Sequence, residues 1–304
     1  MKPKLFACAA VICLLLPASF EAQKNGTQTN SAMVKLRVTV VDAQSGLVDN
    51  LPKESFTVYE GSTKQTIESF SFELGNLSCG FLVDTSGSMR PYMELVKRIV
   101  LALLKVIGNK DESCLVSFKA EPELIQDFTS DKVEIEKAVD EMYSSGGSSL
   151  FDAIVATSDH LLKKGKNQRK ALVIITDSME SNSGFDLKKT MKAVEENNVP
   201  IYILTLPYLS EDRRSKAKKL GKAEEAVIRL ADISGGEAFF SESLARLDSD
   251  IQKVGAAIQA RYLINYISDN KTRKGQFQEL RIEVRDKNSV LLTPIVREGY
   301  FAFK

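Results

Sequence analysis

The chain has 304 residues, of which 43% are hydrophobic and 27% are charged. This composition is typical of globular proteins and excludes a chain that is disordered throughout. The 41 basic and 40 acidic residues give a formal net charge of +1, so the chain lacks the basic excess on which nucleic-acid binding depends. The length allows one large domain or two smaller ones, each with a sizeable core.

The N-terminal residues predict an export signal. Two lysines precede an apolar run from Leu5 to Leu16, and small residues follow the run, which predicts a signal peptide over residues 1–22. The run is too short to span a bilayer, and a retained membrane anchor is the alternative. Residues 23–32 are polar and aperiodic and predict a linker. We therefore expect a secreted, periplasmic or cell-envelope protein with no membrane span after signal cleavage.

Two segments with β-strand character flank a longer segment in which strands and helices alternate. Residues 33–75 begin with "VKLRVTVVD", whose alternating apolar and polar residues predict a half-buried strand, and continue with two strands around a turn at Glu60–Gly61. Residues 261–304 return to strands in "RYLINYIS", "FQELRIEVRD" and "EGYFAF". Each flank is short for an independent domain, so we expect the two to form one small β-sandwich-like domain together.

Residues 76–260 predict an α/β domain inserted between these flanks. Strands are predicted at "CGFLV", "SCLVSF", "ALVIIT", "PIYILTL" and "EAFFS", and the first and third lack alternation, as strands covered on both faces do. Helices are predicted between the strands, over residues 91–107, 131–142, 150–163, 186–197, 223–233 and 244–260. This order predicts a Rossmann-like, open and mostly parallel sheet with helices on both faces.

Cys79 and Cys114 are the two cysteines beyond the predicted signal peptide, and both fall in predicted strands. Export permits a disulfide between them. The alternative is a pair of small buried hydrophobic side chains, which we favour because neighbouring strands of a parallel sheet seldom meet the geometry of a disulfide.

Oxygen-bearing side chains follow three of the predicted strands or turns in the α/β segment. Asp84, Ser86 and Ser88 follow the strand "CGFLV", Ser148 follows two glycines at the start of a helix, and Asp177 follows the strand "ALVIIT". Ligands of open α/β sheets bind at the carboxyl ends of the strands, where these residues are expected. Carboxylates and hydroxyls without thiolate or imidazole suit Mg²⁺, Mn²⁺ or Ca²⁺ rather than zinc or copper.

These motifs resemble the von Willebrand factor type A domain with its metal-ion-dependent adhesion site. The resemblance rests on "DTSGSM", the Gly-Gly-hydroxyl turn and the strand ending in Thr-Asp, and it extends over roughly residues 76–260. The flanks are similar to exported bacterial von Willebrand factor A-related proteins in "SFTVYEG…KQTIESF" and "REGYFAF". The resemblance implies a metal held by Asp84, Ser86, Ser88, Ser148 and Asp177.

Two positions depart from the family pattern. Ser148 stands where the family has threonine, which keeps the hydroxyl but loses the methyl group that restrains its rotamer. Ser178 stands where the family has glycine after the distal aspartate, which constrains the loop.

Other polar residues near these motifs have simpler interpretations. Asp152 is expected to stabilise the start of its helix or to orient the ligands. Glu180 is a candidate accessory ligand, and His160, the single histidine, is expected to be structural. The chain has no G-x-S-x-G motif, no phosphate-binding lysine loop, no dinucleotide fingerprint and no Cys/His zinc set.

We therefore predict a non-enzymatic, exported protein-binding or adhesion module. The resemblance implies that its metal ion captures an acidic group, Asp or Glu, of a partner protein. The alternative is a structural or assembly protein of the cell envelope whose metal site is weak or vestigial. A metal-assisted hydrolase using Asp84 is the enzymatic alternative, but hydroxyl ligands are poorly suited to activating water.

Overall fold

The computed structural model describes residues 33–44, 46–206, 221–241, 243–268 and 276–302. All of them belong to one compact unit. The predicted signal peptide and linker lie outside the described residues.

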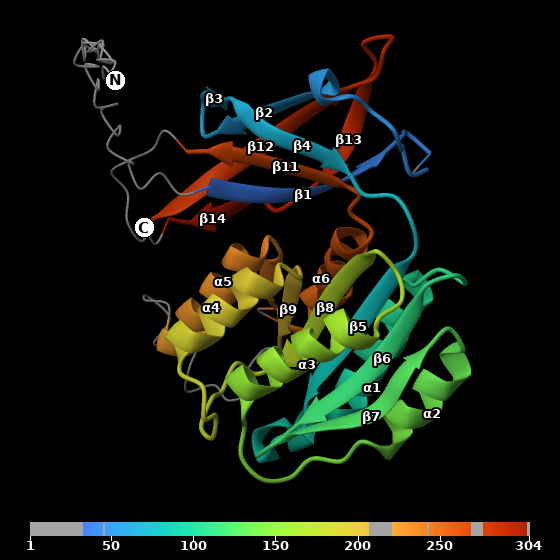
Figure 1. Cartoon of the computed structure of the whole chain (residues 1–304), viewed down its shortest axis with the longest axis vertical. Helices are drawn as coiled ribbons and strands as arrows, with labels where there is room; N and C mark the ends of the chain where they lie inside the picture. Colours follow the sequence, from blue (N-terminus) through green and yellow to red (C-terminus); the bar gives the residue numbers. More distant parts are fainter. Residues whose placement is uncertain (1–32, 45, 207–220, 242, 269–275, 303–304) are drawn as a thin grey trace, which may run out of the picture. The chain divides into compact units, whose positions relative to one another are not determined.

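A six-stranded sheet forms the centre of the α/β part (Figure 1). Its strand order is β10-β9-β8-β5-β6-β7, and all neighbouring strands are parallel except β6 and β7. The strands are β5 Leu77–Asp84, β6 Glu112–Phe118, β7 Pro122–Thr129, β8 Arg169–Thr176, β9 Ile201–Thr205 and β10 Glu237–Phe240. The predicted mostly parallel sheet is confirmed, and all the predicted strands of this segment belong to it.

The sequence pattern does not predict β7, the antiparallel edge strand. Its residues, "PELIQDFT", are partly exposed and show neither a continuous apolar run nor strict alternation. Such a pattern arises because an edge strand has a neighbour on one side alone and has less apolar surface to bury.

In the described residues, six α-helices surround the sheet. They are α1 Met93–Val106, α2 Lys132–Glu141, α3 Leu150–Lys164, α4 Leu187–Asn197, α5 Lys222–Ser234 and α6 Leu244–Ile258. Every predicted helix is present, but the first begins at Met93 rather than Pro91. A 3-10 helix, η2 Gly87–Tyr92, precedes it because the chain must first turn away from the end of β5.

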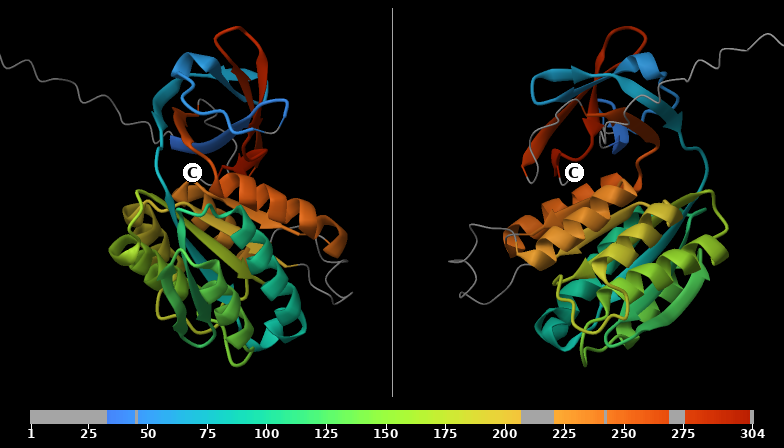
Figure 2. Two further views of the ribbon diagram at one scale, coloured as in Figure 1. Left: turned by 90° about the vertical axis from the view of Figure 1, so that its right-hand side faces the viewer. Right: turned by 60° about the vertical axis from the view of Figure 1, so that its left-hand side comes forward.

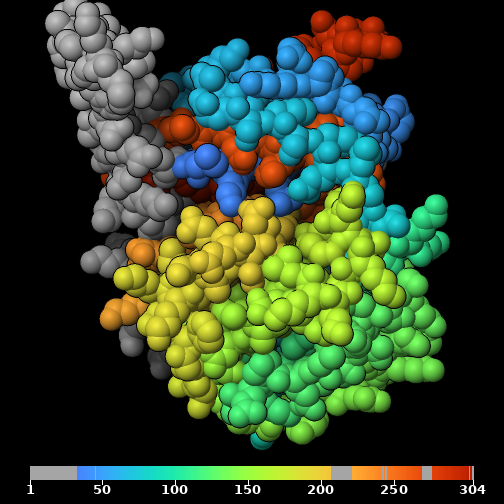
Figure 3. All heavy atoms as spheres, viewed as in Figure 1, coloured from blue at the N-terminus to red at the C-terminus, as the bar shows by residue number. Residues whose placement is uncertain are grey.

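The helices cover both faces of the sheet and bury a separate core on each (Figure 2). Consecutive strand residues point to opposite faces, so Phe81 belongs to the core under α1, α2 and α6, while Leu82 belongs to the core under α3, α4 and α5. Figure 3 shows α3 in yellow-green and α4 in yellow lying over one face. The predicted two-faced architecture is confirmed.

The flanking segments form one connected antiparallel sheet, in the order β3-β2-β12-β13-β1-β11-β4, with β14 pairing with β12. Its strands are β1 Met33–Val41, β2 Phe56–Glu60, β3 Thr63–Gln65, β4 Ile67–Phe72, β11 Tyr262–Ile267, β12 Phe277–Arg285, β13 Leu291–Ile295 and β14 Gly299–Phe301, and a short 3-10 helix, η1 Lys53–Ser55, precedes β2. Strands from both flanks alternate in this order. The N- and C-terminal flanks therefore pair into one sheet, as expected from their sequences.

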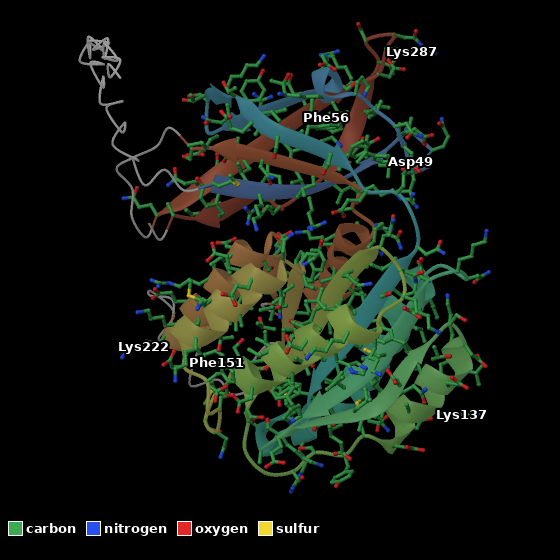
Figure 4. All side chains as sticks on the ribbon, viewed as in Figure 1. Asp49, Phe56, Lys137, Phe151, Lys222 and Lys287 are labelled. Carbon is green, nitrogen blue, oxygen red and sulfur yellow. The ribbon has the colours of Figure 1, made fainter. Side chains whose placement is uncertain are left out.

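The antiparallel sheet is strongly bent and approaches a barrel, rather than forming two stacked sheets. Residues 33–38 of β1 pair with β11, and residues 39–41 pair with β13. Phe56 of β2 and Phe70 of β4 come from distant positions in the strand order, yet their ring centroids lie 5.2 Å apart. Phe56, labelled in Figure 4, lies among the strands of this sheet. This closure refines the predicted β-sandwich.

The sequence pattern does not predict two short strands of the flanks, β3 and β13. β3 is separated from β4 by Thr66 alone, so the two look like one strand in the sequence. β13 contains Pro294, which lacks the N–H of a regular strand residue and hides the pattern.

Cys79 and Cys114 are buried free thiols that point to opposite faces of the sheet. Cys79 is in register with Ser113, so Cys114 stands one residue further along β6 and shares a face with Gly80. Burial raises the pKa of the Cys114 thiol to about 12. The disulfide alternative is therefore wrong, and both cysteines act as apolar side chains.

Candidate functional site

The predicted metal ligands lie on three loops at the carboxyl ends of the parallel strands, at the lower end of this sheet in Figure 1. The first loop follows β5 and contains Asp84, Ser86 and Ser88. The second precedes α3 and contains Ser148, and the third follows β8 and contains Asp177. Of these residues, Ser88 is exposed and the others are buried.

Backbone hydrogen bonds join the first loop to the second. The Gly87 N–H donates to the carbonyl oxygen of Gly146 over 2.9 Å, and the Ser145 N–H donates to the carbonyl oxygen of Thr85 over 2.8 Å. These bonds fix the two loops side by side, because each closes a contact between main chains rather than between mobile side chains.

Ser148 joins the second loop to the third. Its hydroxyl donates to the carbonyl oxygen of Met179 over 2.7 Å, and its carbonyl oxygen accepts from the N–H groups of Ser181 and Asn182. Once its proton is donated, the hydroxyl oxygen keeps lone pairs that can bind a cation.

Asp84 joins the first loop to the third. One carboxylate oxygen accepts from the Ser86 N–H over 2.9 Å, and the other accepts from the Thr176 hydroxyl over 2.7 Å. Burial raises the pKa of Asp84 to about 6, and the negative charge of Asp177 contributes in the same direction. No basic side chain of the described residues forms an ion pair with Asp84.

Thr176 is a residue of the site that the sequence analysis does not assign. Its hydroxyl donates to Asp84 and accepts from the Ser178 N–H over 2.9 Å, so it links the ends of β5 and β8. The motif "TD" at the end of β8 contains this residue, but its role depends on a contact 92 residues away in sequence.

The two glycines before Ser148 serve different purposes. Gly146 has a φ of +70°, a backbone conformation that side chains with a Cβ disfavour. At Gly147 a Cβ would lie 1.9 Å from the Asn182 side-chain oxygen. The first glycine therefore permits the turn, and the second lets the third loop approach.

Ser178 has a φ of +66°, in the left-handed region that favours glycine. Its hydroxyl is buried without a hydrogen-bond partner. The predicted constraint on this loop is therefore present as an unfavourable backbone conformation at Ser178, the residue after Asp177.

Glu180 is not placed as an accessory ligand. Its two oxygens accept from the N–H groups of Phe151, Asn182 and Ser183 and from the Ser183 hydroxyl. The carboxylate thus caps the first turn of α3 and holds the third loop. These hydrogen bonds use both of its oxygens.

Asp152 and His160 have structural contacts. The oxygens of Asp152 accept from the Gly184 and Phe185 N–H groups, so it orients the third loop from the first turn of α3. The His160 ring lies 2.8 Å from a carboxylate oxygen of Asp127 and stacks on Phe128. It therefore fastens α3 to β7, as expected of a structural residue.

The donor set fits a hard divalent cation. It combines two carboxylates with three hydroxyls, and the buried carboxylate of Asp84 meets hydrogen-bond donors but no basic side chain among the described residues. No group of three or more His, Cys, Asp or Glu residues that could hold a metal occurs in the described ranges. A site with hydroxyl ligands does not need such a group.

Sequence comparison relates this part of the chain to a known family. Residues 80–180 match the family model of the von Willebrand factor type A domain. The match begins in β5 and ends within the loop after β8, so it includes the five candidate ligands. No curated protein matches the chain in sequence.

Several solved structures are similar to this chain. A von Willebrand factor type A protein from Catenulispora acidiphila has a TM-score of 0.51 and 12% identity, covering 91% of this chain and 76% of that one. Proximal thread matrix protein 1 from the mussel byssus has a TM-score of 0.50 and 14% identity, covering 64% of this chain and 49% of that one. The conserved hypothetical protein BatB from Bacteroides thetaiotaomicron has a TM-score of 0.45 and 16% identity, covering 60% of this chain and 100% of that one. At such identities the first two similarities show a shared fold.

Among the described residues, none of the helices is both long and apolar enough to cross a membrane.

Proposed function

We propose that this protein is an exported, non-enzymatic binding module that captures an acidic group of a partner protein through a divalent cation, Mg²⁺, Mn²⁺ or Ca²⁺. The supporting observation is that hydrogen bonds join three loops next to Asp84. Asp84 is a buried carboxylate with no cationic partner in the described part of the chain. The match to the von Willebrand factor type A domain over these loops supports the same function.

Each side chain has a distinct part in this proposal. Ser86, Ser88 and Ser148 would hold the cation directly through hydroxyl oxygens, while Asp84 and Asp177 would supply the negative charge. A cation held by few anionic ligands remains electron-poor and attracts a carboxylate from outside. Thr176 positions Asp84, because its hydroxyl donates to the carboxylate that must face the cation.

Thermal unfolding with added metal tests the cation site without knowledge of the partner. A ligand of the folded state stabilises it by about 1.4 kcal/mol at ten times its Kd, so Mg²⁺ or Mn²⁺ should raise the Tm relative to EDTA. Asp84→Asn and Ser88→Ala should abolish or weaken this rise. Ser88 is exposed, so its substitution leaves folding intact. An unchanged Tm at millimolar metal would favour the alternative of an envelope structural protein with a vestigial site.

Capture from a native extract tests the second part of the proposal. Immobilised wild-type protein in Mg²⁺ should retain a protein that EDTA elutes, and Asp84→Asn should retain none. Binding that is equal in Mg²⁺ and EDTA would contradict metal-dependent capture.

A further inference from the structure

A second candidate site lies far in sequence from the metal loops. A cavity of about 790 Å³ is lined by residues of β9, β10, α5 and α6 and of the segment from β13 to β14. Its volume lies within the range of small-molecule sites in proteins. The aromatic side chains Tyr202, Phe239 and Tyr300 contribute to its wall.

The basic side chains around this cavity are already engaged. Arg297 pairs with Asp232 at 2.5 Å and lies over the ring of Tyr300, and Lys253 lies 3.4 Å from Glu298.

The other two basic groups are engaged as well. Arg37 pairs with Glu73 at 2.8 Å, and Arg246 also takes part in an interaction within the chain. The cavity therefore offers little free positive charge to an anionic ligand.

Two carboxylates that line the cavity have no ion-pair partner among the described residues. Asp250 of α6 is 7% exposed, and its Oδ2 atom is buried without a hydrogen-bond partner. Glu237, at the start of β10, is half-buried, and its carboxylate has no hydrogen bond or ion pair with another described residue. Burial raises the pKa of Glu237 to about 7, despite the opposing charges of Arg297 and Lys253. The buried Asp250 oxygen without a donor is destabilising, and the half-buried Glu237 carboxylate has no ion-pair partner among the described residues, so both groups favour a donor from a ligand.

We propose that this cavity binds a small organic amine, whose ammonium group pairs with Asp250 and Glu237 and whose carbon chain packs on the aromatic wall. An ammonium group supplies hydrogen-bond donors and positive charge together, which both carboxylates lack. Aromatic faces attract cations and cover aliphatic chains. The proposed site is independent of the metal site and needs no divalent cation.

Binding of 1,5-diaminopentane in EDTA tests the proposal, with 1,5-pentanediol and glutarate as neutral and anionic probes of similar length. We expect the diamine at millimolar concentration to raise the Tm and to give saturation-transfer signals by NMR, and the diol and glutarate to give neither. Asp250→Asn and Glu237→Gln should each weaken diamine binding about tenfold, as expected for the loss of a charge-assisted hydrogen bond.

Asp248→Asn is the matched control, because Asp248 is an exposed carboxylate of the same helix. It should leave diamine binding unchanged. Equal binding by the Asp250→Asn, Glu237→Gln and Asp248→Asn variants would overturn the proposal, as would an equal response to glutarate or the diol. The Mg²⁺-induced rise in Tm should persist in the Asp250 and Glu237 variants, which separates this site from the metal site.

Discussion

The antiparallel sheet buries the carboxylate of Glu60, and the loops of the parallel sheet bury that of Asp84. The two carboxylates differ in their hydrogen-bond partners. Glu60 of β2 is 6% exposed and accepts from the hydroxyls of Tyr266, Ser268 and Tyr300 at 2.8, 2.9 and 3.1 Å. The donors to Asp84 include the Ser86 N–H and the Thr176 hydroxyl, and a second aspartate, Asp177, acts on it electrostatically. Neither has a cationic partner in the described part of the chain.

The difference lies in what surrounds each group. The donors to Glu60 come from β11, the residue after it, and β14, so the carboxylate ties both flanks of the chain into one sheet. The surroundings of Asp84 are oxygen atoms that can themselves bind a cation. Glu60 is therefore a structural carboxylate satisfied by protein donors, whereas Asp84 is a candidate metal ligand because further oxygen-bearing side chains accompany it.

Replacing Glu60 is expected to have the largest effect on stability. Glu60→Leu leaves three buried hydroxyls without their acceptor and should lower the free energy of unfolding by about 4 kcal/mol. Glu60→Gln keeps an acceptor oxygen and should lose about half as much. Urea denaturation measures both. A loss below about 1 kcal/mol for Glu60→Leu would show that the hydroxyls find other partners and that Glu60 does not hold the flanks together. The Mg²⁺ response should persist in Glu60→Gln.

The carboxyl group of Glu237 should make stability depend on pH. Burial holds its folded-state pKa near 7, above the ordinary 4.5, while Arg297 and Lys253 oppose the shift and Glu298 and Asp232 add to it. The folded state then binds the proton more tightly than the unfolded state. Its contribution is fully present below about pH 4.5 and is lost as the pH rises through 7, by up to about 3 kcal/mol.

Glu237→Gln removes this titration. The stability of the wild type minus that of Glu237→Gln should therefore fall between pH 4.5 and pH 8, as measured by urea denaturation in EDTA. A stability difference that stays constant over this range would mean that the carboxylate finds a hydrogen-bond partner in solution. Glu237 would then be a structural carboxylate like Glu60 rather than a candidate ligand group like Asp84.

Thr176→Val separates positioning from folding at the proposed metal site. The variant keeps the shape of the side chain but loses the hydroxyl that serves Asp84 and Ser178, which should cost about 2 kcal/mol. It should also weaken the Mg²⁺-induced rise in Tm. Thr157→Val is a suitable control, because Thr157 is buried and its hydroxyl has no hydrogen-bond partner. An intact Mg²⁺ response in Thr176→Val would assign Thr176 to folding alone.

Ser178→Gly should have the smallest effect, and it should stabilise the protein. Glycine adopts a φ of +66° without strain and removes a buried hydroxyl that lacks a partner, for a gain of about 1 kcal/mol. Thermal unfolding and Mg²⁺ titration together measure the change. A loss of stability would mean that the hydroxyl has a partner in solution and that Ser178 is suited to this loop.

The sequence alone determined the class of the fold and the position of the candidate ligands along the chain. Strands buried on both faces appear as continuous apolar runs such as "ALVIIT", and amphipathic helices repeat their apolar residues every three or four positions. A strand that ends in Asp or in Asp-Thr-Ser places oxygen atoms at a predictable edge of the sheet. These features depend on neighbours in sequence, so a single chain reveals them.

The tertiary structure decided what depends on distant residues. The edge strand β7 and the closure of the antiparallel sheet arise from pairing between segments far apart in the chain, which leaves little local pattern. The capping role of Glu180, the contact of Thr176 with Asp84 and the opposite orientation of the two cysteines likewise follow from strand register and loop packing. A hydrogen bond depends on where two atoms meet in space, and for Asp84 and Glu60 that meeting distinguishes a candidate ligand from a structural carboxylate.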